Sequence, residues 1–226
     1  MKTTINLMSK LYHLVLKPHS SKNSLYHIFL NAFKYTTFLI CSLALPFLLN
    51  GCSQEQPIKI GFIGGLTGRV ADLGVSGRNG ALLAIEQRNN SGGINGTPIH
   101  FIAVDDKQDK NTAVREFNSL VAQGMEAIIG HMTSSMSVAT VPLANKAPIV
   151  LMSPTATTTF LSDIDDYFLR VCATTDTYAK EMARYLRKTK KLTEVAVVYD
   201  LKNKAYTQSW INHFNNEFIY IFLNIY

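Results

Sequence analysis

The fold is set by an early stretch of the chain, residues 58–74, which reads IKIGFIGGLTGRVADLG. Its first half, Ile58–Ile63, is rich in isoleucine with one phenylalanine and predicts a buried β-strand. Its second half, Gly64–Gly74, is punctuated by glycines and predicts a loop. A strand followed by such a loop is the usual opening of an α/β unit.

The alternation of strand and helix continues downstream. Apolar side chains on helical spacing predict a helix over Val75–Asn89, which the Asn-Asn-Ser-Gly-Gly cluster at 89–93 ends. The next predicted elements are strands Pro98–Val104, Ala127–Ile129 and Ile149–Met152, a helix Thr112–Ala122 capped by Asn111, a helix after Ser134, and an extended segment Tyr167–Val171. This order predicts the α/β class, with a parallel sheet, helices on both faces and right-handed connections.

A second cycle of the same kind begins after residue 172. It is predicted as a helix over Thr175–Lys188, a strand over Glu194–Tyr199 and a helix over Tyr206–Glu217. We therefore expect a nearly complete first lobe over 58–172 and only the start of a second lobe over 173–217.

The last residues, 218–226, have a different composition, because aromatic and isoleucine side chains follow one another without a turn signal. Two interpretations remain open. The segment is either an exposed apolar edge strand, or an aberrant tail left by a frameshift or a premature stop. The second interpretation predicts a chain that is truncated at its C-terminus and impaired in function.

The positive charge of the chain belongs to its leader. Of 22 basic residues, five lysines precede Cys52, whereas all 16 acidic residues follow it, which leaves 17 basic against 16 acidic side chains. A nearly neutral body gives no electrostatic reason to expect nucleic acid as a partner, since phosphate binding depends on clustered Lys and Arg.

The leader predicts export. The uncharged apolar run Thr37–Leu49 is too short for a membrane span, which needs about 20 residues, but suits the core of a signal peptide. The tetrapeptide Leu49-Asn50-Gly51-Cys52 resembles the bacterial lipobox, so that 1–51 is predicted as a lipoprotein signal peptide and 52–57 as a tether. We expect a lipid on Cys52 to anchor the protein in the periplasm or on the outer face of the cell membrane. The alternative is an ordinary leader that ends near a cysteine by chance.

Three predicted loops carry the chemistry of a binding site. In an open parallel sheet, ligands bind beyond the carboxyl ends of the strands, where this chain has Gly65–Gly68, Gly130–Ser135 and Ser153–Thr158. Hydroxyls and free backbone N–H groups near a helix start can hold a carboxylate. Each loop alone is also ordinary turn and capping chemistry, but three at one end of one sheet favour a ligand site.

Several phrases of the sequence also occur in one known family, in this order and spacing. They are Ile60–Gly61 through Leu66–Gly68, Gly92–Gly96, Asp105-Asp106, Ile129–His131, Ser134-Ser135 and Ser153–Thr157. From Ile58 to about Phe214 the chain resembles the periplasmic leucine/isoleucine/valine-binding protein family, the substrate-binding proteins of branched-chain amino acid ABC importers. The resemblance implies the type I periplasmic-binding-protein fold. It also implies a receptor that closes on a small amino-acid-like ligand and delivers it to an ABC permease in the inner membrane.

The resemblance assigns roles to five residues. Ser134 and Ser135, with nearby backbone N–H groups, would bind the ligand α-carboxylate. The Thr155 carbonyl and the Thr157 hydroxyl would accept hydrogen bonds from the α-ammonium, and Tyr206 would face the cleft from the second lobe. The identity of the ligand does not follow, since Leu73 stands where the family often has an aromatic residue. The acidic residue that the second lobe usually adds to the ammonium site does not occur before the chain ends, so we expect weak binding.

Enzymatic readings find no support, since the chain has no GxSxG, HExxH, P-loop or clean GxGxxG motif. No Cys/His cluster suggests a metal, and no cofactor is expected. His131 and Asp105-Asp106 are predicted to be structural, and Cys172 a small buried apolar residue. Two other functions remain open: the ligand-binding domain of a sensory receptor or regulator, which shares this fold, and a non-functional gene remnant.

Overall fold

The structure, a computed structural model, describes residues 29–37 and 56–223, and the chain divides into two units, Met1–Gln54 and Glu55–Tyr226. In the first unit, residues 29–37 form a helix. Cys52 and the rest of the predicted lipobox lie outside the described residues. Of the helices that the structure describes, none combines the length and the apolar character needed to cross a membrane.

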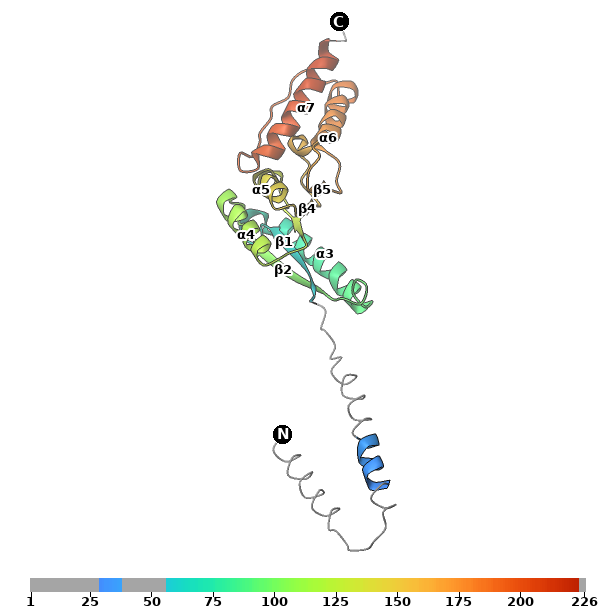
Figure 1. Ribbon diagram of the computed structural model, residues 1–226. Coiled ribbons are helices and arrows are strands. Elements are labelled where there is room, and N and C mark those ends of the chain that lie inside the picture. Colours follow the sequence, from blue (N-terminus) through green and yellow to red (C-terminus); the bar gives the residue numbers. More distant parts are fainter. Residues whose placement is uncertain (1–28, 38–55, 224–226) are drawn as a thin grey trace, which may run out of the picture. The chain divides into compact units, whose positions relative to one another are not determined.

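The second unit is built on a five-stranded parallel sheet (Figure 1). Its strands are β1 (Ile58–Gly64), β2 (Ile99–Asp105), β3 (Ala127–Gly130), β4 (Val150–Ser153) and β5 (Phe168–Arg170), in the order β2-β1-β3-β4-β5. The strand order reverses at β1, which pairs with β2 on one side and β3 on the other. Open α/β sheets bind ligands at such a reversal. The predicted fold class is confirmed.

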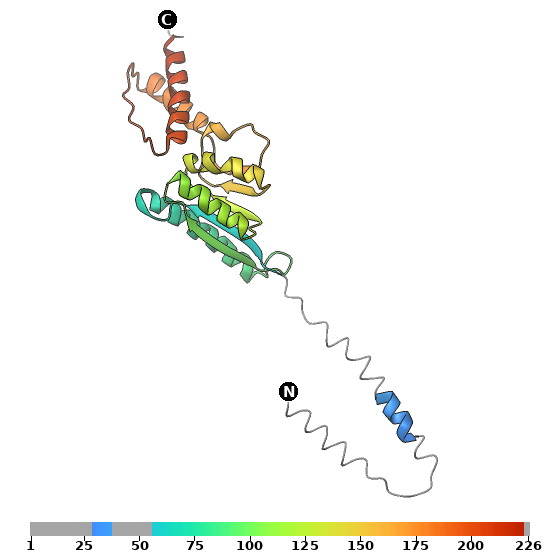
Figure 2. The same ribbon diagram turned by 60° about the vertical axis from the view of Figure 1, so that its left-hand side comes forward.

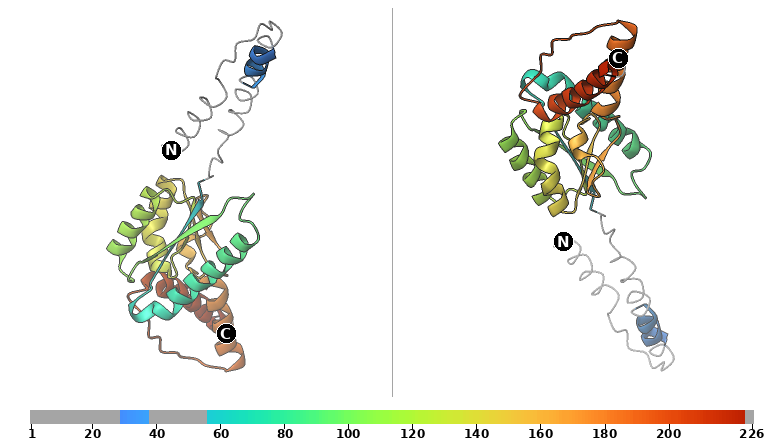
Figure 3. Two further views of the ribbon diagram at one scale, coloured as in Figure 1. Left: turned by 90° about the horizontal axis from the view of Figure 1, so that it is seen from below. Right: turned by 90° about the horizontal axis from the view of Figure 1, so that it is seen from above.

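Helices cover both faces of the sheet, as predicted (Figure 3). Successive side chains of a strand point to opposite faces. Ile63 packs into the cluster with α4 (Lys110–Ala122) and α5 (Ser134–Lys146). Phe62 lies on the other face, toward α3 (Ala71–Asn90), where a Cβ on Gly77 would lie 3.6 Å from its ring. Central strand β1 is therefore buried on both faces.

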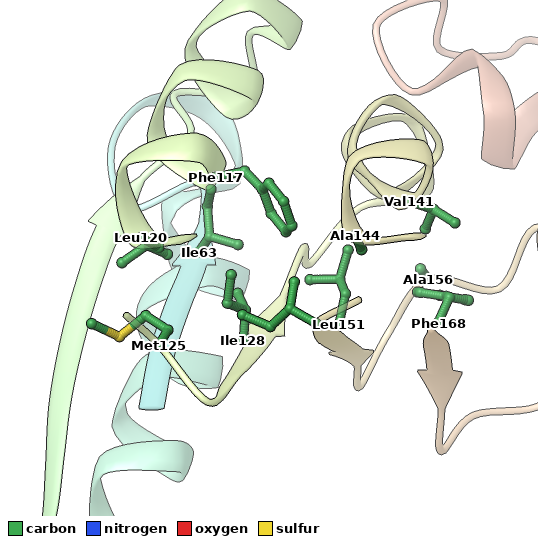
Figure 4. Packing of buried hydrophobic residues seen from close by; sticks show 11 residues of the cluster. Ile63, Phe117, Leu120, Met125, Ile128, Val141, Ala144, Leu151, Ala156 and Phe168 are labelled. Carbon is green, nitrogen blue, oxygen red and sulfur yellow. The ribbon is translucent and has the colours of Figure 1, made fainter. Parts of the chain in front are cut away.

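The main core lies between the sheet and the pair α4/α5 (Figure 4). Its buried members are Ile63, Phe117, Leu120, Met125, Ile128, Val141, Ala144, Ile149, Leu151, Ala156 and Phe168. Apolar side chains from four strands and two helices meet here, so burial of this surface is the main stabilising term of the unit.

Helix α3 begins earlier than the sequence predicts. Gly74 was expected in a loop, but it lies inside α3, which starts at Ala71. A Cβ on Gly74 would stand 1.9 Å from the Gly65 carbonyl oxygen. The glycine therefore serves close packing of the helix on the loop after β1, and does not break the helix.

The predicted cap of α4 is also wrong. Helix α4 begins at Lys110, and the Asp109 side chain, not Asn111, accepts from the Thr112 N–H at 2.8 Å. Asp and Asn are equally good capping residues, so the sequence alone did not separate the two positions.

A second, smaller core joins α6 (Thr175–Arg184) to α7 (Lys204–Leu223), which pack side by side (Figure 2). Ala179 and Ala183 contact Phe214 and Phe218, and Trp210 stacks on Phe214 with ring centroids 5.0 Å apart. Helix α6 continues into a short π-helical segment, η3 (Tyr185–Thr189), in agreement with the predicted helix Thr175–Lys188.

The predicted strand Glu194–Tyr199 is absent; these residues have no regular secondary structure. A strand requires a neighbour to pair with its backbone, and no other strand among residues 56–223 lies beside this segment. Val195 is half-buried against the α6/α7 core, but the other apolar side chains of the segment are exposed, with Val198 at 99%. Residues 194–199 thus have the composition of a β-strand but no neighbouring strand, among the described residues, with which to form backbone hydrogen bonds.

Residues 218–223 are the last turns of α7, so the edge-strand interpretation of 218–226 is wrong for them. Phe218 is buried against Phe214 at a centroid separation of 5.4 Å. Apolar residues that follow a helix at helical spacing can extend its buried face, which is what Phe218 does here.

Truncating Leu120 should test the main core. Leu120 is fully buried in the cluster, so Leu120→Ala is expected to lower the free energy of unfolding by about 2–5 kcal/mol through lost burial and a residual cavity. Leu83→Ala on α3, where the side chain is 55% exposed, is the control and should change it by less than about 0.5 kcal/mol. Urea denaturation followed by circular dichroism measures both. Equal losses in the two variants would show that this cluster is not the main core.

Candidate functional site

The loops that follow β1, β2, β3 and β4 form the candidate ligand site at the carboxyl end of the sheet. They are residues 65–67, 106–109, 131–133 and 154–158. Parallel strands bring these loops to one edge, and side-chain hydrogen bonds then fix them to one another.

Asp105 ties the loop after β1 to the loop after β2. Its carboxylate accepts from the Leu66 N–H at 2.7 Å, the Thr67 hydroxyl at 2.5 Å and the Lys107 N–H at 2.9 Å. Burial disfavours the charge, but the hydrogen bond from Thr67 and those from the neighbouring backbone N–H groups outweigh it, and they hold the pKa of Asp105 below its usual range. This carboxylate is thus a fixed structural anion.

Asp106 and His131 form a second, buried link. His131 Nδ1 lies 2.7 Å from Asp106 Oδ2, and both side chains are almost completely buried. Because β1 lies between β2 and β3, this contact crosses over the end of β1. Gly65 lies beside this pair: a Cβ there would be in ordinary van der Waals contact with Asp106 Oδ1, at 3.5 Å, but would come within 2.6 Å of Val70 Cγ2. His131 Nε2 is buried without a hydrogen-bond partner among the described residues.

Ser153 joins the loop after β3 to the loop after β4. Its hydroxyl donates to the His131 carbonyl at 2.5 Å and accepts from the Ala156 N–H at 3.0 Å. In parallel, the Thr155 hydroxyl donates to the Met132 carbonyl at 2.6 Å. Ser153 and His131 lie in loops where the sequence predicts the site, and His131 and Asp106 were predicted to be structural. The contacts that join these loops were not predicted, because sequence gives no signal for such long-range pairing.

Ser134, which the family resemblance implies as a carboxylate-binding residue, is the first residue of α5. It is buried, and its hydroxyl accepts from the Thr158 N–H at 3.3 Å, which leaves its own proton to donate. Among the described residues, the backbone N–H groups of Ser134 and Met136 have no acceptor. Unused N–H groups at a helix N-terminus, together with the helix dipole, can hold an anion.

Thr157 provides an unused acceptor close by in the same loop system. Its Oγ1 is buried and has no hydrogen-bond partner within the described part of the chain, while its carbonyl accepts from the Thr175 N–H at 2.8 Å. The Thr155 carbonyl likewise accepts nothing from the described residues. A buried polar atom without a partner is costly, so these acceptors suit a ligand that donates hydrogen bonds.

Ser135 contacts the start of α7. Its N–H donates to Asn203 Oδ1 at 3.1 Å, and its hydroxyl accepts from the Ala205 N–H at 3.0 Å. Tyr206, in the first turn of α7, is 39% exposed. The sequence does not predict the contact of Asn203 with α5. An Asn before a predicted helix indicates a helix cap, but it does not indicate a contact with another helix.

A network of hydrogen bonds also connects the segment after β4 to α6 and α7. Thr159 Oγ1 lies 2.9 Å from both Ser209 Oγ and His213 Nε2, and Ser209 Oγ lies 2.6 Å from Thr175 Oγ1. His213 Nδ1 in turn lies 3.0 Å from Asp176 Oδ1. These contacts position α7 next to the loop after β4.

A hollow of about 450 Å³ lies away from these loops. It is lined by Arg187, Thr193, Glu194, Val195, Asn215, Phe218 and Ile219. Residues 193–195 form one wall of the hollow, and none of its lining residues is a residue of the predicted site.

A family model described as "Periplasmic binding protein" matches residues 57–214, which include every strand and all the loops of the site. This chain belongs to that family. The family is one of solute-binding proteins. The predicted resemblance is therefore confirmed, and the family's curated members extend the comparison to branched-chain amino acid binding proteins.

Two curated family members illustrate the similarity. A Leu/Ile/Val-binding protein of Rhizobium johnstonii is 31% identical over 166 residues, which cover 73% of this chain and 44% of that protein. A leucine-specific-binding protein of Salmonella typhimurium is 31% identical over 149 residues, which cover 66% and 40% of the two chains. This family member thus spans less than half the length of these curated relatives.

Solved structures in the family share the fold. The branched-chain amino acid transporter substrate binding protein of Streptococcus pneumoniae, in complex with isoleucine, matches with a TM-score of 0.61 and 29% identity over 70% of this chain and 47% of that one. A leucine binding protein of Thermotoga maritima matches with a TM-score of 0.66 and 22% identity, over 73% and 46%. The second match bears on the fold alone.

The Asp105 anion should make stability depend on pH in a defined direction. Because its folded pKa lies below the ordinary 3.8, its contribution is fully present above that pH and is lost as the pH falls through the folded value. Asp105→Asn is expected to lower the free energy of unfolding by about 1 kcal/mol at pH 7.

The difference between Asp105→Asn and the unchanged protein should shrink below about pH 4 in urea titrations at successive pH values. Thr67→Val, which removes one donor to Asp105, should show a smaller loss with the same pH profile. A gap that stays constant down to pH 3 would contradict the assignment.

Proposed function

We propose that this chain is a non-catalytic solute-binding protein that captures a small amino-acid-like ligand at the carboxyl end of its sheet and delivers it to an ABC importer. The ligand carries a carboxylate and an ammonium group. The ligand binds between two parts of the chain. One is the set of loops in the proposed lobe 1 (58–172), and the other is α7, which belongs to the proposed start of lobe 2 (173–217).

The observation that carries the proposal is the pairing of unused donors with unused acceptors. The N–H groups of Ser134 and Met136 are donors without partners, and the Thr155 carbonyl and Thr157 hydroxyl are acceptors without partners, among the described residues. Ser134 and Thr157 belong to loops that are directly bonded through Thr158. The carboxylate of a zwitterionic amino acid would accept hydrogen bonds from the two N–H groups, and its ammonium group would donate to the Thr155 carbonyl and the Thr157 hydroxyl.

The proposed orientation follows from charge. The ligand carboxylate lies at the N-terminus of α5, where the helix dipole favours an anion. The ammonium group donates to the Thr155 carbonyl and to Thr157 Oγ1. Tyr206 faces the ligand from α7. The relatives named for leucine, isoleucine and valine support an aliphatic amino acid as the first ligand to test.

The proposed cellular setting is the periplasm or the outer face of the cell membrane. A signal peptide over 1–51, a lipid on Cys52 and a tether over 52–57 place the protein there, and its permease partner lies in the inner membrane. The name of the family, periplasmic binding protein, supports the location.

Removing the Thr157 acceptor should weaken ligand binding. Thr157→Val keeps the shape but cannot accept from an ammonium group, so the affinity for leucine is expected to fall about 10- to 100-fold. Thr157→Ser should retain most of it, and Thr177→Val, at an exposed threonine on α6, should leave it unchanged.

Nuclear magnetic resonance titration with leucine, isoleucine, valine and the non-zwitterionic control isocaproate measures weak and tight binding alike. If no amino acid shifts the resonances of Ser134 and Thr157, or if Thr157→Val binds as tightly as the unchanged protein, the proposed function is wrong.

A further inference from the structure

Asn203 lies just before α7, yet its side chain reaches the N-terminus of α5. Ser135 N–H donates to Asn203 Oδ1 at 3.1 Å, and in return the Ala205 N–H donates to Ser135 Oγ at 3.0 Å. These reciprocal bonds join the starts of α5 and α7, and the bonded residues are 68 and 70 positions apart in the sequence.

The Asn203 amide oxygen occupies part of the proposed carboxylate position. Of the first three backbone N–H groups of α5, those of Ser134 and Met136 have no acceptor among the described residues, and that of Ser135 has Asn203. A carbonyl oxygen of a neutral amide resembles one oxygen of a carboxylate in shape and in partial charge. A carboxylate that used all three N–H groups would have to displace it.

The segment that carries Asn203 is held in place independently of Ser135. The Asn203 carbonyl accepts from the Tyr206 and Thr207 N–H groups at 3.0 and 3.1 Å. Three residues earlier, Asp200 pairs with Arg69 at 2.7 Å, which ties the segment to the turn after β1. The side chain of Asn203 can therefore rotate away from Ser135 while its backbone remains in the first turn of α7.

We propose that Asn203 is an internal competitor for the ligand carboxylate and thereby limits the affinity of the site. This inference rests on the proposed function. Without ligand, the amide satisfies the Ser135 N–H. A charged carboxylate forms hydrogen bonds about twice as strong as a neutral acceptor does, so an amino acid displaces Asn203, whereas a carboxamide analogue gains nothing over the group it replaces. Every ligand that uses the Ser135 N–H has to displace the Asn203 amide, so the competitor lowers the affinity for all of them. A carboxylate offsets this cost best because its hydrogen bonds are the stronger ones.

Two substitutions at Asn203 should act in opposite directions on leucine binding. Asn203→Ala removes the competitor, so the affinity for leucine should rise about three- to tenfold, and the affinity for leucinamide should rise by a similar factor. Asn203→Asp fixes a charged competitor in the same place and should weaken leucine binding more than tenfold. Asp caps a helix as well as Asn does, so α7 should be retained.

The full chain is titrated with leucine and leucinamide by nuclear magnetic resonance, with Asn216→Ala and Asn216→Asp on the exposed part of α7 as matched controls that should leave both affinities unchanged. A purely structural role for Asn203 predicts that both of its substitutions weaken binding. That result, or unchanged affinities, would overturn the inference.

A measurement without ligand separates this inference from the proposed function. Amide hydrogen exchange at Ser135 should be faster in Asn203→Ala than in the unchanged protein and slower in Asn203→Asp. If Ser135 responds in this way but no variant binds any amino acid, the proposed function fails and the competitor role fails with it. If leucine binds and Ser135 exchange is the same in all three proteins, only the inference about Asn203 fails.

Discussion

The contact between Asp106 and His131 is the constraint on which the rest of the site depends. These side chains follow β2 and β3, which are not neighbours in the sheet, and they meet at 2.7 Å across the end of β1. The pair is buried, so removing either partner would leave a polar group without compensation, at a cost of several kcal/mol.

The Asp106–His131 contact also helps to fix the neighbouring loops of the candidate site. The His131 carbonyl receives the Ser153 hydroxyl, and Ser153 in turn fixes the backbone around Ala156. Because these bonds are satisfied within the protein, the groups left without a partner among the described residues are the ones available to the proposed ligand. Ser134 and Thr157 are thus held by their neighbours while keeping capacity for one more partner, which is the preorganisation that a binding site needs.

Much of this arrangement could be predicted from the sequence, and the misses have physical causes. The five strands and the four helices from α3 to α6 were found because buried strands and amphipathic helices have strong periodic signals. The cap of α4 was misplaced by two residues because Asp109 and Asn111 are equivalent in propensity. The strand at 194–199 was wrong because β-prone composition does not supply a neighbouring strand. Asn203 and the Asp106–His131 pair are contacts between distant segments, and no local pattern encodes them.

The segment at 194–199 has a further consequence for the lifetime of the protein. Proteases bind their substrates as extended chains with free backbone N–H and C=O groups, and cleavage is favoured where local unfolding costs little. Residues 194–199 already have that form, since their backbone makes no hydrogen bond within the described part of the chain. Cutting there would separate α7 from the chain that precedes it, and with α7 would go Asn203, Tyr206 and the helix face that covers the site, while the five-stranded sheet stays whole. Proteolysis of this chain would thus begin by removing one wall of the candidate site.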